Sequence, residues 1–299
     1  MRAYRLDIQV GMGGWDLPPF QKHFYPPRPK NGFRKLEFYS QFFDFVEVNS
    51  TFYNSSLDPE HSRQWIRDVE QNRHFFFAVK LFRGFTHTFT ADRKDYLSVL
   101  RLLDPLVSNG RFAGLVVQFP HSFTNIRERR AYLIQLAKGF RPHRIFLEVR
   151  HDSWNSPLMY NFFQENHLHL INVDLPPLRR HMPLTSLSWE GVGYYRFMGR
   201  NEQTWFHSVN GERYLYHYST EELNHLLYLI EQTRSQSDQT FVVFHNDPEA
   251  NSLVNGFQLK HLLRKKKVLV PQHLIEAYPS LKPISSSVNI LHPLFAECP

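Results

Sequence analysis

The run Ala113-Gly-Leu-Val-Val-Gln-Phe119 is apolar apart from one polar residue near its end. Continuous rather than alternating hydrophobicity is typical of a strand that is covered on both faces. Seven further runs share this character: Asp7–Met12, Phe45–Asn49, Phe75–Leu81, Ile145–Arg150, Leu168–Asp174, Val192–Phe197 and Thr240–His245. The sequence therefore predicts eight buried strands.

Apolar residues at helical spacing lie between most of these runs. The segments are Phe33–Phe43, Tyr96–Leu106, Ile126–Phe140 and Leu223–Ile230, and Leu253–Leu263 follows the last run. Strands that alternate with helices indicate a parallel α/β architecture. Eight such units favour a single TIM-like (β/α) barrel over an open sheet, which stays the alternative.

Two segments depart from this alternation. Leu175–Trp189 is rich in proline and has no helical period, so we expect a long loop instead of a helix between the sixth and seventh strands. Gly199–Tyr218, rich in aromatic residues, predicts a second long loop. We expect a barrel domain at residues 1–264 and a partly irregular C-terminal extension at residues 265–299.

The composition excludes several classes of protein. The chain has 299 residues, of which 42% are hydrophobic and 21% charged, so wholesale disorder is excluded. Its single cysteine, Cys298, permits no intrachain disulfide and no cysteine-based zinc site. The sequence lacks an apolar stretch of about 18 residues and a signal peptide, so we expect a cytoplasmic protein without a membrane partner. The net charge of +7 is compatible with anionic partners.

Polar residues gather where the predicted strands end. They are Glu47, Asn49, Lys80, Gln118, Glu148, Arg150, Asn172, Asp174, Arg196, His245 and Asp247. In a barrel the carboxyl ends of the strands meet at one face, which is where such folds carry their chemistry. We therefore expect Lys80, Arg150 and Arg196 to face Glu47, Glu148 and Asp174 at this end of the barrel. A purely structural alternative pairs Glu148 with Arg196 or Arg150 in a network that fills the barrel.

Seven short motifs follow one another along the chain: Gly11-Met-Gly-Gly-Trp15, Phe24-Tyr-Pro26, Val46-Glu-Val-Asn-Ser-Thr-Phe-Tyr53, Phe77-Ala-Val-Lys80, Thr86-His87, Glu148-Val-Arg-His-Asp-Ser-Trp154 and Phe244-His-Asn-Asp247. In this order they resemble the motifs of the YecE-like family, catalogued as domain of unknown function 72. The resemblance spans roughly residues 7–264 and implies a TIM-barrel-like fold, but no known reaction. Met198 stands where the family usually has histidine. His245-Asn246 and Pro120-His121 replace the family's pairs of asparagines and prolines.

The residues favour an enzyme, of hydrolase type, that uses carboxylate acid–base chemistry on an anionic or phosphorylated substrate. Glu47 and Glu148 are the candidate acid and base, and Lys80, Arg150 and Arg196 are the candidate anion-binding cations. The full predicted catalytic set is Glu47, Glu148, Asp174, Lys80 and His87. The predicted substrate-binding set is Trp15, Asn49, Tyr53, Gln118, Arg150, Trp154, Arg196, Asn246 and Asp247.

A divalent metal is an alternative that the sequence does not favour. Glu148, Asp174 and His245 are suitable ligand types, but no diagnostic spacing accompanies them, and nearby cations compete for the carboxylates.

Two other classes of function stay open. A nucleic-acid-binding or endonuclease-like protein would use the basic runs Arg127–Arg130, Arg179–Arg180 and Arg264–Lys267. Because such runs are more often solvated helix faces, and the endonuclease idea rests on fold analogy alone, this class is the weaker one. A barrel that binds a small molecule without turning it over would use the same pocket as the enzyme.

Overall fold

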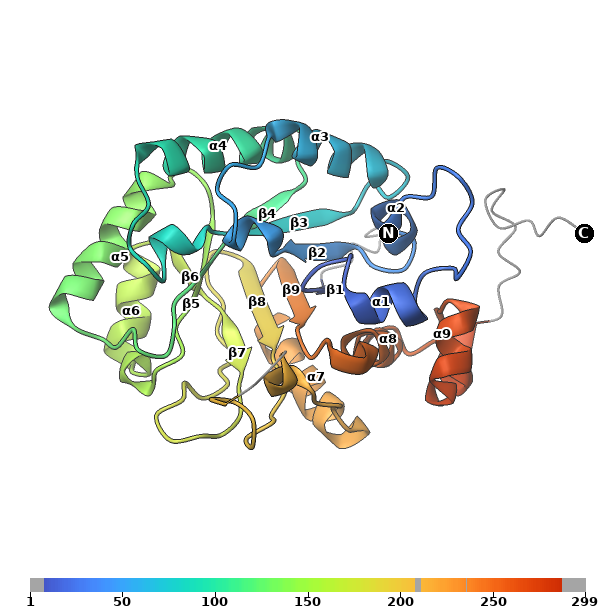
Figure 1. Ribbon diagram of the computed structural model, residues 1–299. Coiled ribbons are helices and arrows are strands. Elements are labelled where there is room, and N and C mark those ends of the chain that lie inside the picture. The colour runs from blue at the N-terminus through green and yellow to red at the C-terminus, as the bar shows by residue number, and fades with distance from the viewer. Residues whose placement is uncertain (1–7, 208–210, 235, 287–299) are drawn as a thin grey trace, which may run out of the picture.

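The computed structural model describes residues 8–207, 211–234 and 236–286 of the chain. Nine parallel strands form one sheet in the order β6-β5-β4-β3-β2-β1-β9-β8-β7 (Figure 1). The strands are β1 (Ile8–Met12), β2 (Phe45–Val48), β3 (Phe76–Lys80), β4 (Phe112–Gln118), β5 (Ile145–Glu148), β6 (Leu168–Leu170), β7 (Asn172–Asp174), β8 (Val192–Phe197) and β9 (Gln239–Phe244). All eight predicted strands are confirmed, and the sixth is divided in two.

The division at Ile171 closes the barrel. β6 pairs with β5, whereas β7 pairs with β8, so the two halves of one extended segment bond to opposite neighbours. These halves are the two ends of the sheet order, yet only Ile171 separates them in the chain. The sheet therefore curls until its edges meet, which confirms a TIM-like barrel rather than an open sheet.

Helices surround the sheet and cover its outer face (Figure 1). They are α1 (Pro18–His23), α2 (Lys35–Tyr39), α3 (Pro59–Asp68), α4 (Arg93–Ser108), α5 (Arg127–Gly139), α6 (Pro157–Glu165), α7 (Thr220–Arg234), α8 (Asn251–Arg264) and α9 (Gln272–Ala277). The segment between β7 and β8 contains no helix, as its prolines predict. Among the described helices, none has the length and apolar character that crossing a membrane requires.

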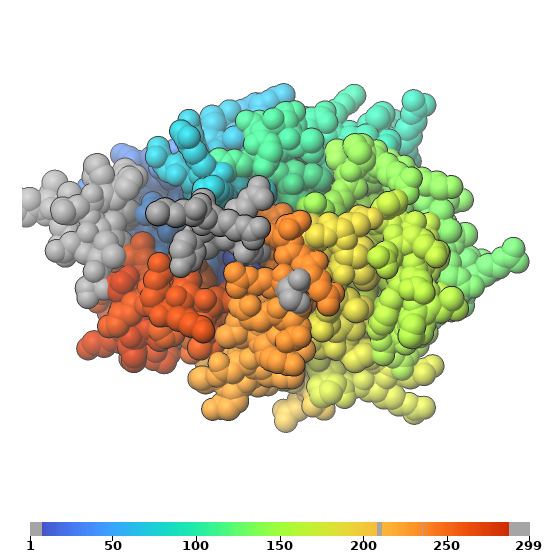
Figure 2. All heavy atoms as spheres, turned by 180° about the vertical axis from the view of Figure 1, so that it is seen from behind, coloured from blue at the N-terminus to red at the C-terminus, as the bar shows by residue number. Residues whose placement is uncertain are grey.

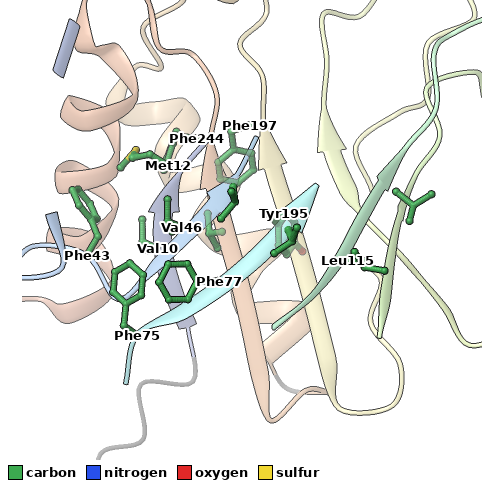
Figure 3. Close-up of a cluster of buried hydrophobic side chains, with 14 of the residues drawn as sticks. Val10, Met12, Phe43, Val46, Phe75, Phe77, Leu115, Tyr195, Phe197 and Phe244 are labelled. Carbon is green, nitrogen blue, oxygen red and sulfur yellow. The ribbon is translucent and has the colours of Figure 1, made fainter. Parts of the chain in front are cut away.

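Two apolar cores lie on the two faces of the sheet. The outer core packs Val10, Val46 and Phe77 against the surrounding helices (Figure 3). The inner core fills the barrel with alternate residues of the same strands. Its strand residues include Phe45, Ala78, Val116, Phe146, Tyr194, Phe241 and Val243. Because side chains alternate along a strand, the inner core fixes which later residues point inward.

The chain beyond α8 continues with regular elements. A short parallel pair, β10 (Val268–Leu269) and β11 (Ser285–Ser286), flanks α9. α9 packs on the N-terminal segment, where the imidazole of His273 hydrogen-bonds the carbonyl of Phe24. Figure 2 shows the molecule from behind, where the segment that follows α8, coloured red, lies beside the orange part of the chain that contains α7. The domain boundary at residue 264 stays a prediction, and Cys298 lies outside the described residues.

Candidate functional site

The alternation that fills the barrel also builds a charged layer at its C-terminal mouth. Six strands each place a polar residue two positions after an inner-core residue, so its side chain points inward. We call these six residues the inner layer: Glu47, Lys80, Gln118, Glu148, Arg196 and His245. Sequence analysis singled out all six, and the structure brings them together.

Arg196 is the centre of the inner layer. Its Nη2 lies 2.9 Å from Oε1 of Glu47, and its Nη1 is ion-paired to Oε2 of Glu148. The Nε and Nη2 atoms also lie 3.2 and 3.0 Å from Nε2 of His245. All these side chains are buried. One guanidinium therefore joins strands from opposite parts of the barrel.

The remaining carboxylate oxygens also have donors. The hydroxyl of Tyr194 donates to Oε2 of Glu47 at 2.8 Å, and Nε of Arg150 donates to Oε1 of Glu148 at 2.6 Å. Two carboxylates thus face two guanidinium groups. Glu148 therefore makes both of the ion pairs considered in the structural alternative, one with Arg196 and one with Arg150.

The network keeps its carboxylates ionised. Burial alone would raise the pKa of Glu47 and Glu148, but the charge of Arg196 and the other neighbouring cations and hydrogen bonds together outweigh it. The pKa of Glu148 falls to about 2, and that of Glu47 also falls well below its ordinary value. Burial and the same guanidinium lower the pKa of His245 to about 4. At neutral pH the two carboxylates therefore stay charged and His245 stays neutral.

Lys80 differs from its neighbours in the inner layer. It is partly exposed, and its Nζ lies 4.3 Å from the centroid of the Phe52 ring. Across the described residues, its ammonium has no hydrogen bond or ion pair. Burial and the charge of Arg196 lower the pKa of Lys80 to about 7, although Glu47 and Glu148 act in the opposite direction. Lys80 can therefore gain or lose a proton near neutrality.

His87 lies against the same phenyl ring as Lys80. The two ring centroids, of His87 and Phe52, are 4.9 Å apart, and Nδ1 of His87 is 2.8 Å from the hydroxyl of Thr86. Burial and the charge of Lys80 lower the pKa of His87 to about 4. The imidazole is thus neutral at physiological pH.

Arg150 extends the site beyond the inner layer. Its Nε is bonded to Glu148, while its two terminal amino groups have no acceptor within the part of the chain that the structure describes. Its guanidinium lies 6.0 Å from the Trp205 ring. Arg150 and Lys80 both present N–H donors without protein acceptors, an arrangement suited to an anion.

Asp174 requires a correction to the predicted arrangement. It does not face Lys80, Arg150 and Arg196, because Val173 and Leu175 are the inward-facing residues of this segment. Asp174 instead points outward, where Nε of Arg200 lies 2.9 Å and the hydroxyl of Tyr218 lies 2.6 Å from its Oδ2.

Arg200 links Asp174 to a further acidic residue. Its Nη1 lies 3.0 Å from Oε1 of Glu222, at the start of α7. We call Asp174, Arg200, Tyr218 and Glu222 the outer cluster. Sequence analysis did not single out Tyr218 or Glu222. Strand parity, by which we mean the alternation of inward and outward side chains along each strand, separates this cluster from the inner layer.

Three aromatic residues predicted to stack on substrate occupy different environments. Trp154 is fully buried, stacks on Phe123 and donates its indole N–H to the carbonyl of Phe123 at 2.7 Å. Trp15 packs edge-on against Trp65. Tyr53 is 73% exposed. The burial of Trp154 contradicts a stacking role for this residue, because neither ring face is open to a ligand.

The side-chain amides of three residues predicted to bind substrate donate hydrogen bonds in different directions. Nε2 of Gln118 donates to the carbonyl of Phe119, and Nδ2 of Asn49 donates to that of Gly13. Nδ2 of Asn246 points away from the barrel interior, toward the carbonyl of Tyr216 and the side chain of Asn255.

Three of the residues predicted to bind substrate each have a side-chain oxygen that accepts no hydrogen bond from the part of the chain that the structure describes. The Oδ1 atoms of Asn49, Asn246 and Asp247 are buried and have no hydrogen-bond partner among the described residues. Burial raises the pKa of Asp247 to about 7.

The candidate metal ligands do not converge. Glu148 and His245 both contact Arg196, and Asp174 lies in the outer cluster. In residues 8–207, 211–234 and 236–286, no three His, Cys, Asp or Glu side chains are placed to hold a metal ion.

The basic runs have contacts within the chain. Arg129 bonds the carbonyl of Ser122 and the hydroxyl of Thr124, and Arg130 bonds Asn125. Arg180 lies 3.4 Å from Asp152.

The closed parallel barrel with charged residues at its C-terminal mouth defines a TIM-barrel-like protein. A family model described as "Protein of unknown function DUF72" matches residues 9–278. The chain belongs to the DUF72 family, which confirms the resemblance seen in its motifs.

Relatives share both sequence and fold. The UPF0759 protein YunF of Bacillus subtilis is 28% identical over 275 residues, covering 86% of this chain and 94% of YunF. The crystal structure of a DUF72 family protein from Thermotoga maritima matches with a TM-score of 0.77 and 29% identity, covering 86% of this chain and 99% of that one. A DUF72 family protein from Enterococcus faecalis matches with a TM-score of 0.76 and 23% identity, covering 86% and 95%. The last match shows the fold alone.

Proposed function

We propose that this protein is a cytoplasmic enzyme that acts on a small anionic substrate, carboxylated or phosphorylated, at the C-terminal mouth of the barrel. One observation carries the proposal. Lys80 and Arg150 lie beside a buried ion network, and both present donors that no described side chain or carbonyl accepts. Such donors in a protected site bind an anion strongly, because water competes with them poorly.

The proton-transfer role belongs to Lys80. A general base works best when its pKa lies near the operating pH, and the pKa of Lys80 is about 7. Glu47 and Glu148 were the sequence-based candidates, but both stay ionised and bonded to Arg196, so neither is a proton donor. Their negative charges instead hold Arg196 and Arg150 in place. Acid–base catalysis of this kind includes hydrolysis, which is the reaction type we propose.

Anion binding is tested first, with inorganic phosphate as the probe. We expect phosphate to raise the melting temperature of the wild-type protein, and expect Lys80→Met and Arg150→Gln each to weaken this effect at least tenfold in phosphate concentration. Arg180→Gln is the matched control, because the Arg180 guanidinium pairs with Asp152 and not with the carboxylates of the inner layer. Equal stabilisation of all four proteins by phosphate contradicts the proposed anion site.

Turnover separates an enzyme from a barrel that only binds. A defined mixture of phosphorylated and carboxylated metabolites is incubated with the protein and followed by mass spectrometry. We expect one component to be consumed by the wild type and by Arg180→Gln, but not by Lys80→Met. Phosphate binding that depends on Lys80 and Arg150, without consumption of any component by the wild type, favours the non-catalytic class.

A further inference from the structure

We propose that Lys80 is a nucleophile that forms an imine with the carbonyl carbon of a substrate that also carries a carboxylate or phosphate. This inference rests on the proposed function and specifies its substrate class, a carbonyl compound with an anionic group. A lysine can attack a carbonyl only as the neutral amine, so it must be partly desolvated, near other cations, and free of a carboxylate partner.

Lys80 meets these conditions by its position. Its backbone is fixed at the end of β3, where the hydroxyl of Thr51 donates to the Lys80 carbonyl at 2.6 Å and Val116 is its partner in β4. The Phe52 ring covers the amine on one side. The charges of Arg196 and Arg150 disfavour the ammonium form, which supports the same conclusion. The side chain is still partly exposed, so a small molecule can approach it.

Lys260 shows what a buried lysine without this role looks like. Its ammonium lies 4.9 Å from the centroid of the Phe43 ring, much as Lys80 lies over Phe52. However, Lys260 is 7% exposed, and its Nζ donates to the carbonyl of Phe42. Its hydrogen bond ties α8 to the segment before β2. Lys260 is therefore a structural lysine, whereas Lys80 keeps its nitrogen free.

The proposed step needs no external oxidant or reductant. The lone pair of the neutral Lys80 amine attacks the carbonyl carbon, a C–N bond forms, and the carbonyl π electrons move to oxygen. A proton passes from nitrogen to that oxygen to give a carbinolamine. The carbinolamine hydroxyl then leaves as water with the second nitrogen-bound proton, and a C=N bond remains. Arg150 binds the anionic group through the terminal amino groups that have no acceptor among the described residues.

The experiment traps the imine by reduction. The wild-type protein is incubated at pH 7.5 with pyruvate and sodium cyanoborohydride, and the modified lysine is located by peptide mass mapping. Pyruvate supplies a ketone and a carboxylate, and butanone supplies the ketone alone. We expect the adduct at Lys80 with pyruvate, at least tenfold more than with butanone. Arg150→Gln should reduce this preference for pyruvate.

Two controls keep the test independent of folding defects. Lys94→Met removes an exposed lysine and should leave the Lys80 adduct unchanged. In the wild type, competitive acetylation across pH should label Lys80 with a midpoint near 7, the pKa of its amine. Adducts spread over surface lysines, with no excess at Lys80, overturn the imine. If Lys80→Met still abolishes phosphate stabilisation in that case, the imine fails while the proposed anion site stands.

Discussion

The inner layer and the outer cluster use the same chemistry in two different settings. Each pairs an arginine with acidic residues at the C-terminal mouth, and each includes a tyrosine hydroxyl on a carboxylate. Arg196 in the inner layer is 1% exposed, whereas Arg200 in the outer cluster is 25% exposed.

The difference follows from strand parity. Residues on the inward side of the strands enter the barrel, where water is excluded and ion pairs strongly influence neighbouring groups. Residues on the outward side meet the loops and helices. Only the inner layer has an unpaired cation, Lys80, beside its network. We therefore base the proposed site on the unpaired amine of Lys80 rather than on the arginine–carboxylate pairs, which both regions share.

The largest expected effect comes from removing the central guanidinium. Arg196→Met leaves the buried carboxylates of Glu47 and Glu148 without their main counter-charge, so we expect the free energy of unfolding to fall by about 3–5 kcal/mol. Arg200→Met is the matched variant in the outer cluster. Because water reaches Arg200, we expect less than half of that loss. Urea denaturation of both variants measures the difference, and equal losses contradict the distinction between the two settings.

The pH dependence of stability is expected to reflect His245. Its pKa is about 4 in the folded protein and near 6.5 when unfolded, so below pH 6.5 the unfolded state binds a proton that the folded state does not. Stability from this group is complete above pH 6.5 and is lost as pH falls toward 4. The loss amounts to roughly 3 kcal/mol.

His245→Asn tests this assignment and restores the residue expected from the family resemblance. We expect the variant to show a smaller decrease in unfolding free energy between pH 6.5 and 4 than the wild type. Other histidines with lowered pKa, such as His169, preserve part of the slope. An unchanged slope in the variant means that His245 is not the group responsible.

We expect a smaller effect on the free energy of unfolding from Gly13→Ala, which adds a single methyl group at the C-terminal mouth of the barrel. The Cβ of Gly13→Ala would lie 2.3 Å from the His245 ring and 3.1 Å from Nδ2 of Asn49, so both side chains must shift. We expect a loss of about 1–3 kcal/mol and weaker stabilisation by phosphate. Gly139→Ala is the control, because beyond its own stretch of helix backbone and its chain neighbours nothing lies within 4 Å of the added carbon. Thermal unfolding that is equally affected in both variants argues against crowding at the inner layer.

The smallest effect is expected at the edge of the outer cluster. Glu222→Gln removes a partly exposed ion pair with Arg200 and should cost less than about 1 kcal/mol, with the difference vanishing at high salt. Phosphate stabilisation should match the wild type. If Glu222→Gln abolishes phosphate stabilisation, the outer cluster takes part in the anion site. That result contradicts the separation of the outer cluster from the proposed site.

The sequence predicts the barrel well because its strands are continuous apolar runs. It does not reveal that the sixth run divides at Ile171, since the division depends on neighbours in the closed sheet. Hydrophobic periodicity does not predict four of the described helices, α1, α3, α6 and α9. Two of them, α3 and α6, begin with a capping residue followed by proline, Asp58-Pro59 and Ser156-Pro157, and this signal could have located them.

The candidate site was predictable wherever strand parity could be anchored to an apolar neighbour. Glu47, Glu148 and Arg196 follow inner-core residues at a spacing of two, so their meeting follows from the pattern. Asp174 and Asn246 were assigned without such an anchor, and both point outward. Within the described ranges, the amine of Lys80 has no ion pair because Glu47 and Glu148 pair with Arg196 and Arg150 instead. The spacing of these residues along the chain does not predict which cation pairs with which carboxylate.

The span of the central ion pair has a consequence for biosynthesis. Glu47 and Arg196 are 149 positions apart, and His245 follows still later. During translation Glu47 is therefore made long before its counter-charge, and the growing half-barrel must keep it hydrated until β8 is complete. Such distant contacts make folding slow. Even then the interior can exclude water only after β9, which pairs with both β1 and β8, has been made.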